Sequence, residues 1–150
     1  MSGRRVVRLL LPLLVLLLTL MGCRSGEPKE GNQLEFTALT LDAAPAEVKQ
    51  YYEEMRAVPG FFVLHREGEA YLLLMAGSVD EPGQSLTITD LRHVEGDWRL
   101  LARLESGEGA AAYPYAVVRV KAPLEARFTA RLVQLSGEVL ELQGMLVSDR

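Results

Sequence analysis

The feature that most constrains this chain is an apolar run of twelve residues near its start. Leu9–Leu20 follows three arginines among the first eight residues and precedes Gly22 and Cys23. A basic segment, a short apolar segment and a small residue before a cleavage point make up a secretory signal peptide. The run is short for a membrane span, which needs about 20 apolar residues, and Pro12 interrupts it. Because the arginines stay on the cytoplasmic side, the residues after the run are expected to face outward.

The segment Leu20-Met21-Gly22-Cys23 resembles the lipobox of bacterial lipoproteins, although Met21 is a less usual occupant of its position. The resemblance implies that a diacylglyceryl thioether forms on Cys23, that residues 1–22 are removed, and that the new amino group is acylated. Two or more acyl chains give stable attachment to a membrane. We therefore expect lipid anchoring on the extracytoplasmic face of the cell membrane. An ordinary signal peptide with an incidental cysteine and a short uncleaved anchor stay open as alternatives.

Composition limits what the mature chain can be. Residues 23–150 contain thirteen Lys and Arg against twenty Asp and Glu, a formal net charge of −7. This acidic balance argues against a nucleic-acid partner, because no basic stripe is present to neutralise phosphates. Cys23 is the only cysteine. Once it carries lipid, no thiol is left for a disulfide or for catalysis.

The first mature residues are expected to form a tether and the start of a domain. Arg24–Gln33 has no apolar residue, so residues 23–33 are interpreted as a lipidated, flexible tether. Leu34–Leu41 alternates as a half-buried strand does. Pro45–Val58 carries apolar residues at helical spacing and predicts a helix that ends before Pro59-Gly60.

The pattern after the helix is β throughout. Phe61–His65 and Tyr71–Met75 predict a hairpin, and Trp98–Leu104 predicts a strand with one apolar face. The last hairpin can be registered, because a loop with Gly137 in the left-handed region places Gln134 opposite Glu138. The expected pairs are then Phe128/Gly144, Ala130/Leu142, Arg131/Glu141, Leu132/Leu140 and Val133/Val139.

These elements predict one α+β domain over residues 34–150. The expected architecture is one N-terminal helix followed by a mostly antiparallel β-sheet that curls into a barrel or a sandwich.

Residues that could carry out catalysis are scarce. His65 and His93 stand in different predicted strands without paired carboxylates, which is a poor metal site. No serine lies in a nucleophile-elbow pattern, although a triad assembled in space stays open as a hydrolase alternative. We therefore expect no enzymatic activity, no metal and no cofactor.

Aromatic residues are more suggestive of binding. Tyr113-Pro114-Tyr115 opens a predicted strand, and proline in a strand favours an edge. Both tyrosines would then point to the same face at an exposed rim. The alternative is that these aromatic residues belong to the core.

The segment from about Phe61 to Pro123 resembles the C-terminal domain of PrcB-type proteins, which are lipoprotein subunits of a surface protease complex. The resemblance rests on four segments. They are Leu72–Gly77, Leu86-Thr87-Ile88, Gly96–Leu100 and the run Tyr113-Pro114-Tyr115-Ala116-Val117-Val118-Arg119-Val120.

The resemblance implies a protein partner, an extracytoplasmic protease, recognised near Tyr113, Pro114, Tyr115, Pro82 and Gly83. The family's Pro-Thr-Gly-Gly-Tyr loop is replaced here by Pro82-Gly83-Gln84-Ser85-Leu86, which puts this recognition in doubt. The sequence thus predicts a membrane-anchored, non-enzymatic lipoprotein that binds a protein partner. A lipoprotein that holds a small molecule or a lipid in an apolar pocket is the alternative.

Overall fold

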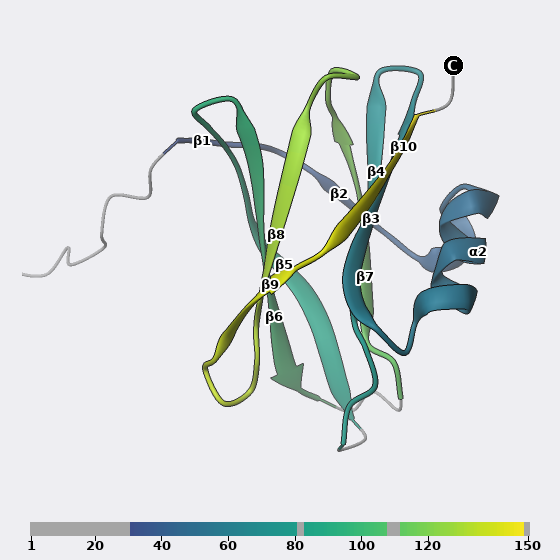
Figure 1. The fold of residues 1–150 in the computed structure, drawn as a ribbon, viewed down its shortest axis with the longest axis vertical. Helices are drawn as coiled ribbons and strands as arrows, with labels where there is room; N and C mark the ends of the chain where they lie inside the picture. Colours follow the sequence, from purple (N-terminus) through teal and green to yellow (C-terminus); the bar gives the residue numbers. More distant parts are fainter. Residues whose placement is uncertain (1–30, 81–82, 108–111, 149–150) are drawn as a thin grey trace, which may run out of the picture. The chain divides into compact units, whose positions relative to one another are not determined.

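The computed structural model describes residues 31–80, 83–107 and 112–148, and residues 31–150 form one compact unit. Cys23, the leader and most of the predicted tether lie outside the described residues. Over the described part, two five-stranded sheets pack face to face, and a single α-helix covers the outer face of one of them (Figure 1). Of the two predicted architectures, a sandwich therefore fits.

Sheet A consists of five strands in the order β1-β5-β6-β8-β9. Their bounds are β1 Asn32–Gln33, β5 Gln84–Val94, β6 Asp97–Ser106, β8 Arg127–Val133 and β9 Val139–Leu142. Sheet B has the order β10-β3-β4-β7-β2. Its bounds are β2 Thr37–Leu39, β3 Pro59–Arg66, β4 Glu69–Ala76, β7 Tyr115–Lys121 and β10 Gly144–Ser148.

The helical residues follow β2. A 3₁₀ turn, η1 (Leu41–Ala43), leads into α2 (Ala46–Met55). The helix begins after Pro45, as the sequence predicts, but it ends three residues before the predicted Val58. β1 and β2 precede the helix, so it is not N-terminal to the strands. The strand predicted over Leu34–Leu41 is present in part, as β2.

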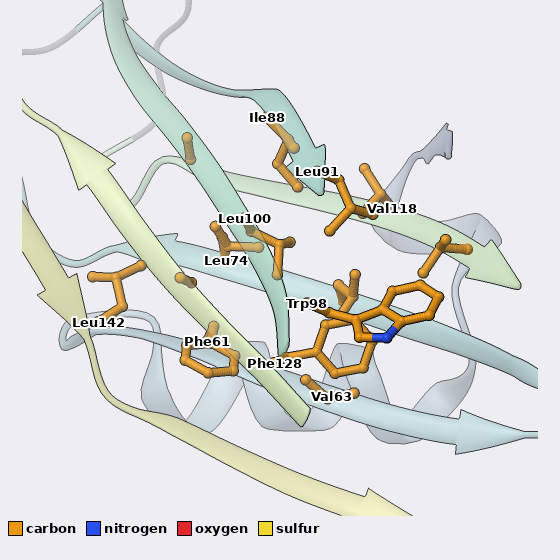
Figure 2. Close-up of a cluster of buried hydrophobic side chains, with 14 of the residues drawn as sticks. Phe61, Val63, Leu74, Ile88, Leu91, Trp98, Leu100, Val118, Phe128 and Leu142 are labelled. Atoms are coloured by element: carbon orange, nitrogen blue, oxygen red, sulfur yellow. The ribbon is translucent and has the colours of Figure 1, made fainter. Parts of the chain in front are cut away.

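The core between the sheets is made by alternating side chains of both sheets. Figure 2 shows Phe61, Val63 and Leu74 of sheet B meeting Trp98, Leu100 and Phe128 of sheet A. The Trp98 and Phe128 rings lie 5.4 Å apart between centroids at an angle of 55°. A tilted aromatic pair of this kind contributes about 0.5–1.5 kcal/mol beyond the area that it buries. The apolar face predicted for Trp98–Leu104 is confirmed.

A second apolar cluster joins the helix to the outer face of sheet B. Val48 and Tyr52 of α2 are buried against side chains of β3, β4 and β7. Tyr51 stacks on Phe62 with ring centroids 4.4 Å apart. These contacts explain why a ten-residue helix, too short to be stable alone, is held in place.

Two hairpins turn through two-residue loops in which both residues have positive φ. Glu67 and Gly68 have φ values of 52° and 78°, and Glu95 and Gly96 have values of 51° and 89°. Such turns match the twist of antiparallel strands. The hairpin predicted over Phe61–Met75 is confirmed, with Arg66 opposite Glu69.

The C-terminal hairpin follows the predicted register along β9. Ala130 pairs with Leu142 and Val133 with Val139, while Gly137 has a φ of 87°. The predicted pair Phe128/Gly144 is wrong, because the chain leaves sheet A after Leu142. Gly144 pairs instead with Phe61, at the edge of sheet B. A Cβ at Gly144 would overlap the Phe61 ring, so the crossing requires glycine.

The sheets are mixed rather than uniformly antiparallel. Strand β8 runs parallel to β6, and β10 runs parallel to β3, whereas the other pairings are antiparallel over the described residues. The chain also crosses between the two sheets at both sides of the sandwich, from the edge strand of one sheet to the edge strand of the other. It passes from β1 to β2 on one side and from β9 to β10 on the other (Figure 1).

The first described residues are fastened to sheet A. The Arg92 Nη1 group donates a hydrogen bond to the Gly31 carbonyl (3.2 Å), and its Nε pairs with Asp90 at 2.7 Å. Both side chains are largely buried beside the bulge between Ile88 and Asp90. Strand pairing thus begins at Asn32, two residues before the expected start of the domain.

Candidate partner-binding site

Two loops that are far apart in the sequence meet at one end of the sandwich. The Gly107 N–H donates to the Gly83 carbonyl (2.7 Å), and the Val79 N–H donates to the Ala112 carbonyl (3.4 Å). Gly83 has a φ of 89°, which favours glycine at this position. These hydrogen bonds join the β4–β5 and β6–β7 connections at the lower end of Figure 1.

The C-terminal end of α2 reaches the same place. The Ser78 N–H donates to the Ala57 carbonyl at 3.3 Å, and Val58 N–H donates to the Met55 carbonyl at 2.9 Å. We call the surface made by residues 55–58, 77–80, 83, 107 and 112–115 the loop end.

Tyr113 is held at the loop end by the helix. The Tyr52 hydroxyl donates a hydrogen bond to the Tyr113 carbonyl at 3.0 Å. The Arg56 guanidinium carbon lies 5.0 Å from the centroid of the Tyr113 ring, a cation–π distance. Tyr113 is consequently half-buried and held by these contacts, whereas the sequence predicted it at an exposed rim.

Pro114 and Tyr115 differ more clearly from the sequence prediction. Pro114 is fully buried one residue before β7, and its carbonyl accepts a hydrogen bond from Ala76 N–H at 3.0 Å. Tyr115 is half-buried, with its ring 4.7 Å from that of Tyr52. The prediction of an exposed edge is wrong, because β7 lies between β4 and β2.

The exposed apolar side chains of the loop end come from the helix side instead. Met55 is 37% exposed and Val58 is 52% exposed. The sequence predicted Met55 on the apolar stripe of a longer helix, with Val58 as the last residue of that helix. They remain exposed because the helix ends at Met55 and the chain turns before β3. Pro82, another predicted site residue, lies outside the described residues.

An apolar hollow opens elsewhere, where the chain crosses from β1 to β2. Its volume is about 280 Å³, and it lies between β2 and β7 on one side and β5 on the other. Its lining is mostly apolar: Phe36, Ala38, Leu39, Leu86, Thr87, Ile88, Tyr115, Ala116, Val117 and Val118. Ligand pockets for drug-sized molecules are typically about 300–1,000 Å³, so this hollow is at the small end.

The two histidines occupy different environments. His65 is only 3% exposed, and its ring lies 5.8 Å from the Phe128 ring in the inter-sheet core. His65 Nε2 has no hydrogen-bond partner among the described residues. His93 is exposed and lies beside Trp98.

The burial of His65 has an electrostatic consequence. Removal from water disfavours the imidazolium and lowers the pKa of His65 below its usual value of 6.5, although the Ala126 backbone and Glu125 favour the charged form.

The described residues hold no group of three or more His, Cys, Asp or Glu side chains that could bind a metal ion. No helix in the same part of the chain is long and apolar enough to cross a membrane.

Comparison with known proteins gives no relative. No family model matches the chain, and no curated protein or solved structure shows significant similarity to it.

Because burial lowers the pKa of His65, we expect acid to destabilise the fold. Between the folded pKa and about 6.5 the unfolded chain binds more protons, so stability falls as the pH is lowered through this window. Urea unfolding of residues 31–150 between pH 8 and pH 5 measures the effect. His65→Leu should flatten the dependence, whereas His93→Gln, at an exposed position, should keep it. An equal slope in wild type and His65→Leu would show that another group is responsible.

Proposed function

We propose that this chain is a membrane-anchored, extracytoplasmic bacterial lipoprotein. Its leader, the Gly22-Cys23 junction and the acidic, thiol-free mature chain support this assignment. Lipid on Cys23 holds the protein to the membrane, and the polar residues after Cys23 act as a tether between the membrane and the domain. The domain works without enzymatic activity or a cofactor.

The domain binds a protein partner through the loop end. The observation that carries this proposal is the position of Met55 and Val58, which are exposed beside the fixed Tyr113. Apolar side chains on a rigid frame suit recognition, because little conformational entropy is lost on binding. The PrcB-type resemblance of the segment that contains Tyr113-Pro114-Tyr115 favours an extracytoplasmic protease as this partner.

A second candidate function is the binding of a small molecule or a lipid. The hollow beside Phe36 and Ile88 favours it, since most of its lining is apolar. Its small volume makes it suitable for a single acyl segment or a compact apolar molecule. Mass spectrometry of molecules extracted from natively purified protein separates this function from partner binding.

Anchoring is tested by the Cys23→Ser variant. Without the thiol no thioether forms, so the protein should move from the membrane fraction to the soluble fraction. Ser25→Ala, two residues away, is the matched control and should stay in the membrane. Immunoblots of fractionated cells measure both. Unchanged membrane retention of Cys23→Ser would refute lipid anchoring.

Partner binding is tested by the Val58→Glu variant. A charge at this exposed apolar position should weaken binding about tenfold or more, as for a buried interface residue. Thr129→Glu, exposed on the outer face of sheet A, is the control and should bind as wild type does. Cross-linking in intact membranes followed by mass spectrometry measures partner recovery. Equal recovery with both variants would rule out the loop end as the binding surface.

A further inference from the structure

Strand β10 forms an open edge of sheet B. Gly144–Ser148 pairs with β3 in parallel register, and all five residues are exposed. About half of the backbone N–H and C=O groups of such an edge strand point away from its neighbour and can pair with another strand. In Figure 1 this strand runs across the front of the sandwich after the crossing from β9.

The side chains of β10 are apolar on both faces. Met145 is 50% exposed, Leu146 is 52% exposed and Val147 is 39% exposed. The strand has no charge and no proline, which are the usual protections of a free edge.

The other three edges of the two sheets are better protected. β1 has two residues and β2 has three. β9 carries Glu141, which pairs with Arg131 of its neighbour at 3.2 Å. The open apolar edge is therefore a particular property of β10 among the described strands.

We propose that β10 pairs with β10 of a second copy, antiparallel about a two-fold axis at Leu146. Leu146 then lies opposite Leu146 of the second copy, Met145 opposite Val147, and Gly144 opposite Ser148. Two-fold pairing sets the strand against an identical strand, with only Leu146 opposite its own symmetry mate. A charged strand would repel its copy, whereas Gly144–Ser148 carries no charge. The two B sheets become one continuous sheet of ten strands.

The small area of this contact favours dimer formation on the membrane over dimer formation in solution. Five residues of strand pairing bury less area than the roughly 1,200–2,000 Å² of a stable soluble interface. Confinement of two copies to one membrane raises their effective concentration without any new contact. The inference therefore rests on the proposed anchoring through Cys23, and the dimer should form mainly on the membrane.

Disulfide trapping in the full-length chain tests the pairing. Directly opposed residues of antiparallel strands have Cα atoms about 4.5–5.5 Å apart, within the roughly 4.4–6.8 Å that a disulfide spans. Leu146→Cys, oxidised with copper phenanthroline in isolated membranes, should give a covalent dimer of twice the chain mass on a non-reducing gel. Thr129→Cys, exposed on sheet A, and the wild type should stay monomeric.

A second variant distinguishes specific pairing of the two β10 strands from disulfide formation by random collision of two copies. Adding Val147→Lys to Leu146→Cys introduces a charge at the open edge, so the dimer yield should fall about fivefold or more. An unchanged yield would overturn the proposed pairing. A monomer only, or a cross-linked product whose mass reveals a different protein, would overturn it as well.

The same samples distinguish this inference from the proposed anchoring. If Leu146→Cys is in the membrane and stays monomeric, pairing fails while anchoring holds. If the protein is instead soluble, anchoring fails, and trapping is repeated on the purified chain at high concentration. Cys23 without lipid is a free thiol, so a dimer of Leu146→Cys there supports the pairing where the wild type gives none, and a monomer overturns it.

Discussion

The burial of apolar side chains between the two sheets is the interaction on which the rest of the structure depends. Trp98 and Phe128 meet Phe61 and Val63 there, and removing one large core side chain typically costs about 2–5 kcal/mol. The same core fixes the path of the chain, because both sheets have to present an apolar face to it. The crossing from β9 to β10 succeeds because Gly144 leaves room for the Phe61 ring. The sandwich is in this way joined at both sides by continuous chain.

The function that we propose follows from what this core leaves exposed. Helix α2 packs on the outer face of sheet B, and its Tyr52 hydroxyl donates a hydrogen bond to the Tyr113 carbonyl at the loop end. The loop end therefore combines a hydrogen-bonded Tyr113 with a small exposed apolar area at Met55 and Val58. The edge at β10 is a second surface, at the side of the sandwich. With the lipid anchor that we propose, the domain would hold a partner at one surface and a second copy at the other.

The local parts of the fold could be predicted from the sequence, and the contacts between distant parts could not. The register of Ala130 with Leu142 followed from the alternation of two strands and the glycine in their loop. The parallel pairing of β8 with β6 had no such signal, because it depends on a connection that changes sheets. Tyr113-Pro114-Tyr115 was predicted to form an exposed rim, which is wrong, because the burial of these residues depends on a helix about sixty residues earlier. Val58, now a principal candidate for partner contact, was predicted as the last residue of the helix. Its exposure could not be predicted, because it depends on the helix ending at Met55.

Both proposed surfaces act from the membrane, to which lipid on Cys23 is proposed to hold the protein. The most direct measurement is the intact mass and N-terminal peptide of the chain extracted from bacterial membranes. We predict a chain that begins at Cys23 and carries a diacylglyceryl group on the thiol and an acyl group on the amine. A chain that retains residues 1–22, or one that is cleaved but carries no lipid, would contradict the account.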